Sequence, residues 1–246
     1  MQVAFQEVTK NFGVVTALKD ITFHVDEGDF IFIVGPSGCG KSTLLKLIMG
    51  QLRPSSGQIN IDGSDLSKTS KNTLDNIRRQ IGVIFQDYQL LFDKTIEENI
   101  ALALDIVNTP RQSILPTIED VLQKVRLESR RHLFPSQLSG GELQRAALAR
   151  ALSVKPRIIL ADEPTGNLDP ENSWNLVKLL KDINEINKTT IIMTTHNLDI
   201  IQSLSKRIIK LDHGSIVKDT KPTPETVITP KVKKKIKKIK VKTKNQ

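Results

Sequence analysis

Residues 30–50 read FIFIVGPSGCGKSTLLKLIMG, and this stretch decides the fold. It opens with apolar, partly β-branched residues that predict a buried strand over 30–34. A glycine-rich turn follows, and then a helical pattern over 41–51. The turn fits G-x-x-x-x-G-K-[ST], in which backbone amides and the start of a helix surround a phosphate group. The stretch therefore predicts a purine triphosphate site between a strand and a helix.

The residues of this loop have distinct expected parts. Lys41 is expected to reach the β- and γ-phosphates, and Ser42 to offer its hydroxyl to Mg²⁺. Cys39, the chain's lone cysteine, is interpreted as a small residue in a variable loop position, and a lone cysteine excludes a disulfide framework. The full expected ATP-binding set from this loop is Gly35, Pro36, Ser37, Gly38, Cys39, Gly40, Lys41, Ser42 and Thr43.

The rest of the chain alternates short apolar runs with helical patterns. Residues 3–8 and 21–25 predict an antiparallel pair, and residues 208–217 predict a strand, a turn and a strand. Asp169 and Pro170 predict the start of a helix, as its N-cap and its first residue. The alternation predicts an α/β fold with a mainly parallel core sheet. The expected core strands are 30–34, 81–85, 157–161 and 190–194, and the expected helices are 41–51, 73–79, 141–153 and 171–187.

Positive charge is concentrated at one end of the chain. Residues 221–246 contain ten of the 36 basic and one of the 27 acidic residues, whereas residues 1–220 contain 26 of each. The neutral body gives no support for nucleic-acid binding by the folded domain. We expect a domain over 1–220 and a Pro-punctuated, Lys-rich tail over 221–246. For that tail three hypotheses stay open: a solvated segment, a helix on anionic lipid, or an RNA contact.

A pair of carboxylates follows the apolar run at 157–161. Asp162 and Glu163 lie where that strand should end, and ligands of open α/β sheets bind beyond the carboxyl ends of the strands. An acid in this place can hold Mg²⁺, directly or through water, and its neighbour can polarise a water molecule aimed at the γ-phosphate. The chain lacks the Asn-Lys-x-Asp motif that reads guanine, which argues against a GTPase.

Further motifs follow along the chain, and their order indicates a family. The sequence LSGGE at 138–142 matches the signature motif of ATP-binding cassette (ABC) ATPases, and residues 1–220 resemble that family. Gln86 resembles its Q-loop glutamine, Asp169 its D-loop aspartate and His196 its switch histidine. The resemblance implies a P-loop NTPase fold with an antiparallel β subdomain and a helical signature subdomain. The signature residues are Leu138, Ser139, Gly140, Gly141 and Glu142.

The resemblance also implies a role for each motif. Glu163 would be the general base, His196 would hold the γ-phosphate and the attacking water, and Gln86 would contact Mg²⁺ and transmit movement to a partner. The metal set would then be Ser42, Gln86 and Asp162. Phe12 lies where the family places an aromatic ring against adenine.

Two subunits are implied by the same resemblance. In the family, the signature motif binds the ATP held by the opposite subunit, and the D-loop residue Asp169 links the two sites. This chain contains one cassette. A homodimer that closes around two ATP molecules is therefore implied.

A membrane partner is expected as well. Residues 87–95, with Leu90, Leu91 and Phe92, are apolar where the family receives a helix of its integral membrane partner. No apolar run approaches the roughly 18–20 residues of a membrane span. The resemblance implies a peripheral protein at the cytoplasmic face of the membrane.

Three stretches resemble the cell-division branch of the family, whose cassettes drive a membrane protein that controls cell-wall hydrolases. Leu143 and the lysine-rich tail depart from that branch's pattern. Two alternatives remain open: a subunit of a lipoprotein-releasing or macrolide-type exporter, and an ABC ATPase acting on ribosomes or nucleic acid. The stretches that favour the cell-division branch are 78–91, 93–99 and 161–169.

Overall fold

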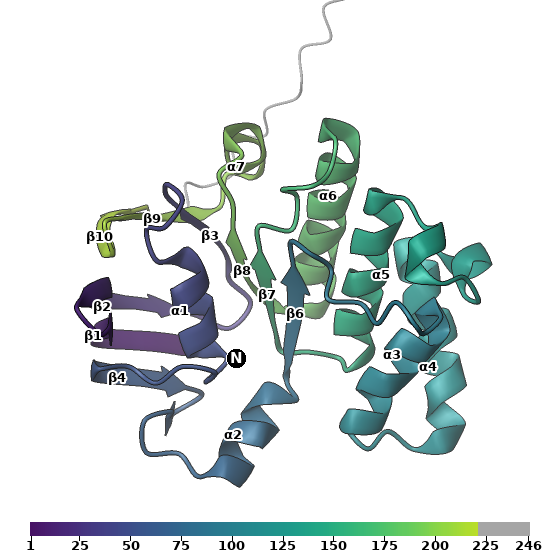
Figure 1. The fold of residues 1–246 in the computed structure, drawn as a ribbon, viewed down its shortest axis with the longest axis horizontal. Coiled ribbons are helices and arrows are strands. Elements are labelled where there is room, and N and C mark those ends of the chain that lie inside the picture. The colour runs from purple at the N-terminus through teal and green to yellow at the C-terminus, as the bar shows by residue number, and fades with distance from the viewer. Residues whose placement is uncertain (221–246) are drawn as a thin grey trace, which may run out of the picture.

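The computed structural model describes residues 1–220, so the predictions for the tail at 221–246 lie outside the described residues. Two sheets organise the described part (Figure 1). The smaller sheet has the order β2-β1-β4-β5, and its pairings are antiparallel, as predicted for the opening segment. Its strands are β1 (Val3–Phe12), β2 (Val15–Val25), β4 (Ser56–Ile61) and β5 (Ser64–Asp65).

The larger sheet has the order β10-β9-β3-β8-β7-β6. Its pairings from β9 to β6 are parallel, and the β9–β10 hairpin is antiparallel. The predicted α/β fold with a mainly parallel core sheet is thus confirmed, and the strand expected at 157–161 lies one residue further along. The strands are β3 (Phe30–Val34), β6 (Ile81–Phe85), β7 (Ile158–Asp162), β8 (Thr190–Thr194), β9 (Arg207–Asp212) and β10 (Ser215–Asp219).

Helices cover both faces of the larger sheet. In Figure 1, α1 (Lys41–Ile48) lies between the two sheets, and α5 (Gly140–Ser153) and α6 (Pro170–Asn187) lie on the other side of the larger sheet. The other α-helices of the described part are α2 (Lys71–Arg78), α3 (Ile96–Ile106), α4 (Arg111–Val125) and α7 (Leu198–Leu204), with 3-10 turns at Glu128–Arg130 and Pro135–Gln137.

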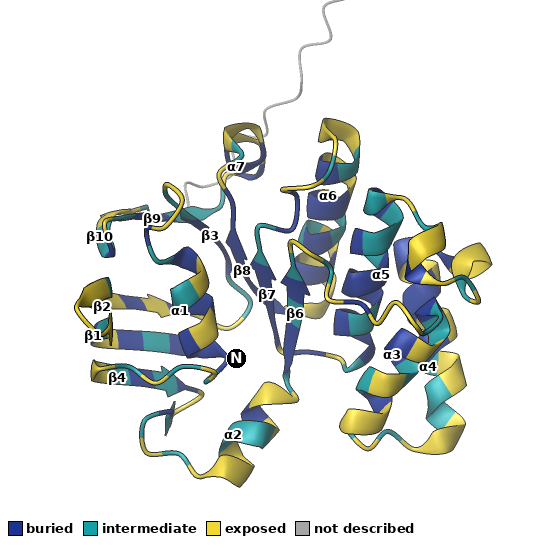
Figure 2. Cartoon of the chain, in the orientation of Figure 1, coloured by how far each residue is buried: buried dark blue, intermediate teal, exposed yellow. Residues whose placement is uncertain are grey.

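The alternation of side chains along β3 explains its continuous apolar run. Phe30 and Phe32 pack into the core formed with the helices α3 to α6, whereas Ile31 and Ile33 pack into the core formed with α1 and the smaller sheet. Successive side chains of a strand point to opposite faces, so both faces need apolar residues. Burial of each such side chain contributes about 1.5–3 kcal/mol. Figure 2 shows these central strands buried.

Several helix boundaries differ from the predictions for local reasons. The helix expected over 73–79 begins at Lys71, because the hydroxyl of Ser70 accepts a hydrogen bond from the N–H of Thr73 and caps it. The helix expected over 41–51 ends at Ile48. The predicted start at Asp169 and Pro170 is confirmed. In residues 1–220, no helix combines the length and the apolar character that crossing a bilayer demands.

Asn99 of α3 fixes the loop that precedes the helix. Its side chain is 1 % exposed. Its Oδ1 accepts from the N–H of Leu91 at 2.8 Å, and its Nδ2 donates to the carbonyl oxygens of Leu91, Lys94 and Thr95 at 3.0, 3.2 and 2.9 Å. One side chain therefore satisfies backbone groups along the whole loop from 91 to 95.

We predict that Asn99→Ala lowers the free energy of unfolding by about 2–3 kcal/mol, because backbone groups of Leu91 lose their partner at a buried position. Urea unfolding followed by circular dichroism measures the change. Asn72→Ala, on the exposed surface of α2, is the control and should stay within about 0.5 kcal/mol of the wild type. Equal stability of the Asn99 variant and the control would contradict the structural role of Asn99.

Candidate active site

The predicted phosphate loop connects β3 to α1 at the carboxyl edge of the larger sheet. Gly40 is the N-cap of α1 and has φ 107°, a conformation that favours glycine. A Cβ at Gly40 would lie 2.6 Å from the carbonyl oxygen of Ala17 in β2. The loop therefore packs against the smaller sheet at a place where a side chain does not fit. This contact fixes the start of α1 relative to the end of β3.

The loop presents unpaired backbone donors. The N–H of Cys39 donates to the carbonyl of Pro36, but the N–H groups of Gly38, Lys41 and Ser42 have no hydrogen-bond partner among residues 1–220. Such groups at a helix start attract anions. The thiol of Cys39 is buried in the core, which agrees with a small filling residue. The observed donors fit a phosphate group.

Lys41 joins the loop to the neighbouring carboxylates. Its Nζ donates to the carbonyl oxygens of Gly35 and Pro36 at 2.9 and 3.1 Å, and it lies 3.3 Å from Oε1 of Glu163. The Lys41 side chain is only 6 % exposed, so its charge is held in place by three oxygens. The ammonium and the carboxylate end of β7 thus form one cluster.

Thr194 holds the two carboxylate residues in position. Its hydroxyl donates to Oδ1 of Asp162 at 2.8 Å and accepts from the N–H of Glu163 at 2.8 Å. The parallel register of β7 and β8 places Thr194 directly beside Asp162. The other carboxylate oxygen of Asp162 is not hydrogen-bonded within the described residues. Thr194 was not among the predicted site residues, because its role depends on this pairing of strands far apart in the sequence.

Glu163 also contacts His196. Nδ1 of His196 lies 3.0 Å from Oε2 of Glu163. Glu163 has φ 45°, a left-handed conformation that costs about 1–2 kcal/mol for a residue with a Cβ. Such strain is concentrated at functional sites. The structure therefore brings together three predicted residues, Lys41, Glu163 and His196.

Gln86 lies against the D-loop rather than against the phosphate loop. Its Nε2 donates to Oδ1 of Asn167 at 3.3 Å, and Nδ2 of Asn167 donates to the carbonyl oxygen of Gln86 at 3.0 Å. No hydrogen bond joins Gln86 to Ser42 or Asp162 within the described residues. The predicted metal set is therefore not assembled by direct contacts among its own members.

The signature motif forms the first turn of α5. Ser139 is its N-cap, and Ser139 and Glu142 form a reciprocal capping box. Nε of Arg130 donates to Oε1 of Glu142 at 2.8 Å. The hydrogen bond from Arg130, followed by those from Ser139, lowers the pKa of Glu142 to about 2. The first turn of α5 is thus held by a carboxylate that stays ionised.

Asn172 connects the signature motif to the D-loop. Asp169 caps α6 by accepting from the N–H of Asn172 at 2.9 Å, and Nδ2 of Asn172 donates to its other oxygen at 2.6 Å. These hydrogen bonds lower the pKa of Asp169. A Cβ at Gly141 would lie 2.7 Å from Oδ1 of Asn172. Glycine at 141 thus allows α6 to approach α5 closely.

Two predicted groups stay apart from the carboxylate cluster. Within the described part of the chain, no hydrogen bond joins the signature motif at 138–142 to the phosphate loop. Phe12 lies at the end of β1, 47 % exposed, with Nζ of Lys10 5.1 Å from its ring centroid. Its strand partner Val15 is two residues before Ala17, which contacts Gly40.

Comparison with known proteins defines the class. Residues 18–166 match the family model described as ABC transporter. The chain belongs to this family and is an ATP-binding ATPase of the ABC type. A structure titled as the dimeric post-hydrolysis state of the ATP-binding cassette MJ0796, bound to ADP and Pi, is similar with a TM-score of 0.81 and 35 % identity. It covers 91 % of this chain and 100 % of that one.

Within the family, the chain resembles cell-division proteins. It is 42 % identical over 218 residues to the cell division ATP-binding protein FtsE of Streptococcus pneumoniae, over 88 % of this chain and 94 % of that protein. It is 43 % identical over 205 residues to FtsE of Bacillus subtilis, over 83 % and 90 %. The chain is therefore an FtsE-like member of the ABC family, as the three stretches indicated.

The low pKa of Glu142 leads to a prediction about pH. Glu142→Gln keeps the capping box but loses the ion pair with Arg130, so its melting temperature at pH 7 should be lower than that of the wild type. The folded-state pKa of about 2 lies below the ordinary value of 4.5. The ion pair's contribution is therefore complete above the ordinary pKa of 4.5 and declines as the pH falls from about 5 toward 2.

Thermal unfolding of both proteins across this pH range provides the test. The difference between their melting temperatures should narrow as the pH falls. A difference that is constant from pH 7 to pH 3 would show that the ionised Glu142 does not stabilise the start of α5.

Proposed function

We propose that this chain is the ATP-hydrolysing subunit of an FtsE–FtsX type complex, which drives a membrane partner and controls cell-wall hydrolysis in bacterial cell division. The observation that carries the proposal is 42 % identity to FtsE along nearly the whole of that protein. The apolar groove described below supports a membrane partner. The protein then acts peripherally, at the cytoplasmic face of the membrane.

The cluster of Lys41, Glu163 and His196 supports a specific mechanism. The γ-phosphate of ATP binds the unpaired amides of the loop and the Lys41 ammonium. The Glu163 carboxylate takes a proton from the attacking water, and His196 orients the water and the γ-phosphate. The contact of His196 with Glu163, 3.0 Å, supports this pairing.

Magnesium fits the oxygen donors near the loop. Ser42 in the first turn of α1 and the unbonded oxygen of Asp162 are suitable hard ligands, together with phosphate oxygens. The side-chain oxygen of Gln86 would complete this set if its amide left Asn167. Mg²⁺ in such a place neutralises charge that develops on the phosphates.

A second copy of the chain completes each site in this proposal. The signature motif offers the N–H groups of an α-helix start but makes no hydrogen bond to the phosphate loop of the same described chain. A helix start of this kind favours an anion. The structure of MJ0796 is titled as a dimer. We infer a homodimer in which the signature residues of one copy contact the ATP on the other copy's loop.

An apolar groove supports the membrane partner. A cavity of about 570 Å³ lies between α2, β6, α3 and α5. Leu91, Leu102 and Ile106 line it and are exposed. Leu90 of the same apolar stretch is 6 % exposed and packs in the core, so only part of the stretch faces the groove. Phe92 is exposed but does not line the groove.

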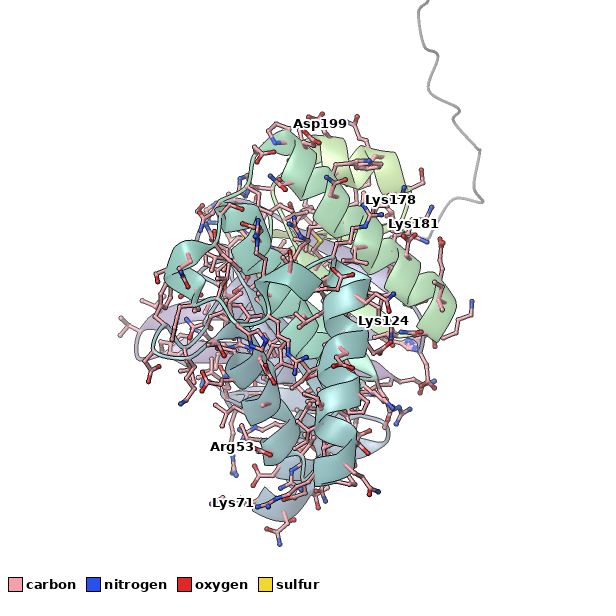
Figure 3. The ribbon with its side chains drawn as sticks, turned by 90° about the vertical axis from the view of Figure 1, so that its right-hand side faces the viewer. Arg53, Lys71, Lys124, Lys178, Lys181 and Asp199 are labelled. Atoms are coloured by element: carbon pink, nitrogen blue, oxygen red, sulfur yellow. The ribbon has the colours of Figure 1, made fainter. Side chains whose placement is uncertain are left out.

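The nucleic-acid alternative finds no support on the face that Figure 3 presents. There Lys124 of α4 lies on the surface, as do Lys178 and Lys181 of α6. Lys124 pairs with Asp120 at 2.7 Å, and Lys181 with Glu185 at 3.6 Å. Interspersed charges of this kind do not make the basic surface that phosphate backbones need.

We predict that Glu163→Gln binds ATP and forms the dimer but hydrolyses ATP about 10²–10⁴-fold more slowly, because the amide cannot accept the proton. Phosphate release and size-exclusion chromatography with ATP measure the two properties. Glu128→Gln, in the turn Glu128–Arg130, is the control and should retain the wild-type rate. Wild-type turnover of the Glu163 variant would exclude this residue as the base.

We predict that Leu102→Glu prevents co-purification of the FtsX-type membrane protein while ATP binding is retained, because a charge in the groove is costly to bury. Leu102 is 40 % exposed in the groove, and Leu115, 47 % exposed on α4, lies outside it. Affinity purification in mild detergent, with Leu115→Glu as the matched control, identifies the partner by mass spectrometry. Recovery of an exporter assembly with the control would favour the transport alternative instead.

A further inference from the structure

The backbone just after Gln86 has an unusual conformation. Tyr88 has φ 64° and Gln89 has φ 51°, and they are the one pair of consecutive non-glycine residues with positive φ in the described chain. The left-handed region is unfavourable for residues with a Cβ. Two neighbours in this region need an external contact that holds them there.

Arg150 provides that contact from the last turn of α5. Its NH2 donates to the carbonyl oxygen of Tyr88 at 3.1 Å, and its NH1 donates to the carbonyl oxygen of Gln89. No carboxylate of residues 1–220 lies within ion-pair distance of Arg150. Burial lowers the pKa of Arg150. A half-buried guanidinium thus donates to the two strained residues and not to an acid.

Tyr88 and Gln89, whose carbonyl oxygens Arg150 holds, lie beside three functional regions. Gln86 precedes them and contacts the D-loop residue Asn167. The Tyr88 hydroxyl oxygen lies 3.2 Å from the position of a Cβ at Gly140, in the signature motif. Arg150 itself lines the apolar groove. The guanidinium therefore lies between the groove and the segment that positions Gln86.

We propose that Arg150 is a positioning residue for ATP hydrolysis: its two hydrogen bonds hold residues 88 and 89 in the left-handed conformation and so fix the backbone from which the Gln86 side chain reaches toward the ATP site. This inference rests on the role proposed for Gln86. Arg150 does not touch ATP in this proposal. Its loss therefore affects kcat through Gln86 and leaves ground-state binding of ATP by the phosphate loop intact.

Steady-state ATP hydrolysis by the purified full chain tests the proposal. Arg150→Met is expected to lower kcat about tenfold with KM for ATP within about twofold, because binding and turnover depend on different groups. Arg111→Met, exposed at the start of α4, is the matched control and should keep the wild-type kcat. Arg150→Gln, whose shorter side chain offers one NH2 group in place of two, should lose about threefold and serves if the methionine variant does not fold.

A glycine rescue separates positioning from general stability. Gln89→Gly removes the steric cost of positive φ, so adding it to Arg150→Met should recover about threefold or more in kcat. A merely structural role of Arg150 predicts no recovery, since glycine does not replace the lost hydrogen bonds. Absence of rescue, or a wild-type kcat in Arg150→Met or Arg150→Gln, overturns the proposal.

A double-mutant cycle with Gln86→Ala distinguishes the role proposed for Arg150 from the role proposed for Gln86. If Arg150 acts through Gln86, the double variant should be no slower than Gln86→Ala alone. Fully additive losses overturn the inference about Arg150. A wild-type kcat in Gln86→Ala overturns the proposed role of Gln86 itself. The two failures are thus separately visible.

Discussion

The parallel pairing of β3, β8 and β7 is the constraint on which the site depends. In register, these strands all end at one edge of the larger sheet. The phosphate loop leaves β3 there, Glu163 follows β7, and Thr194 ends β8. The ion pair of Lys41 with Glu163 therefore joins residues that are far apart in the sequence but lie close together at this edge. Strand ends of a parallel sheet share an edge by geometry, so the cluster follows from the topology.

The patterned parts of this molecule were predictable from the sequence. The buried strands are visible in the sequence as apolar runs. The loop before Lys41 has the glycine pattern of a phosphate site. The start of α6 at Asp169 and Pro170 is equally local. Helices α3 and α4 were expected only as a helical subdomain through the family resemblance. Their apolar residues are shared with other helices of one core, and no residue-level pattern was identified for them.

The residues that were missed have partners distant in the sequence. Thr194 acts through β7, and Asn172 through Gly141. An isolated threonine or asparagine is typical of a turn or a cap, so it has no local signal of such a role. Leu90 shows the same limit for apolar residues, because core and exposed leucines look alike in a short apolar run.

Two of the functional segments contain non-glycine residues with positive φ. Glu163 has positive φ beside the phosphate loop, and Tyr88 and Gln89 have it beside the groove. Each strained place is held by hydrogen bonds from another element: Thr194 for Glu163, and Arg150 for the pair at 88 and 89. Strained residues persist where surrounding contacts determine their conformation. At these two places, contacts from other elements thus hold residues in backbone conformations that are unfavourable on their own.

Helix α5 extends from the dimer surface proposed here to the groove. Its first turn carries the signature motif capped by Ser139, and its last turn carries Arg150 in the groove wall. A helix of 14 residues is about 21 Å long and moves as a rigid body. A partner seated in the groove would therefore contact the same element that presents the signature amides. The hydroxyl of Tyr88 lies against Gly140, and its carbonyl oxygen accepts from Arg150, so the segment after Gln86 contacts both ends of this helix.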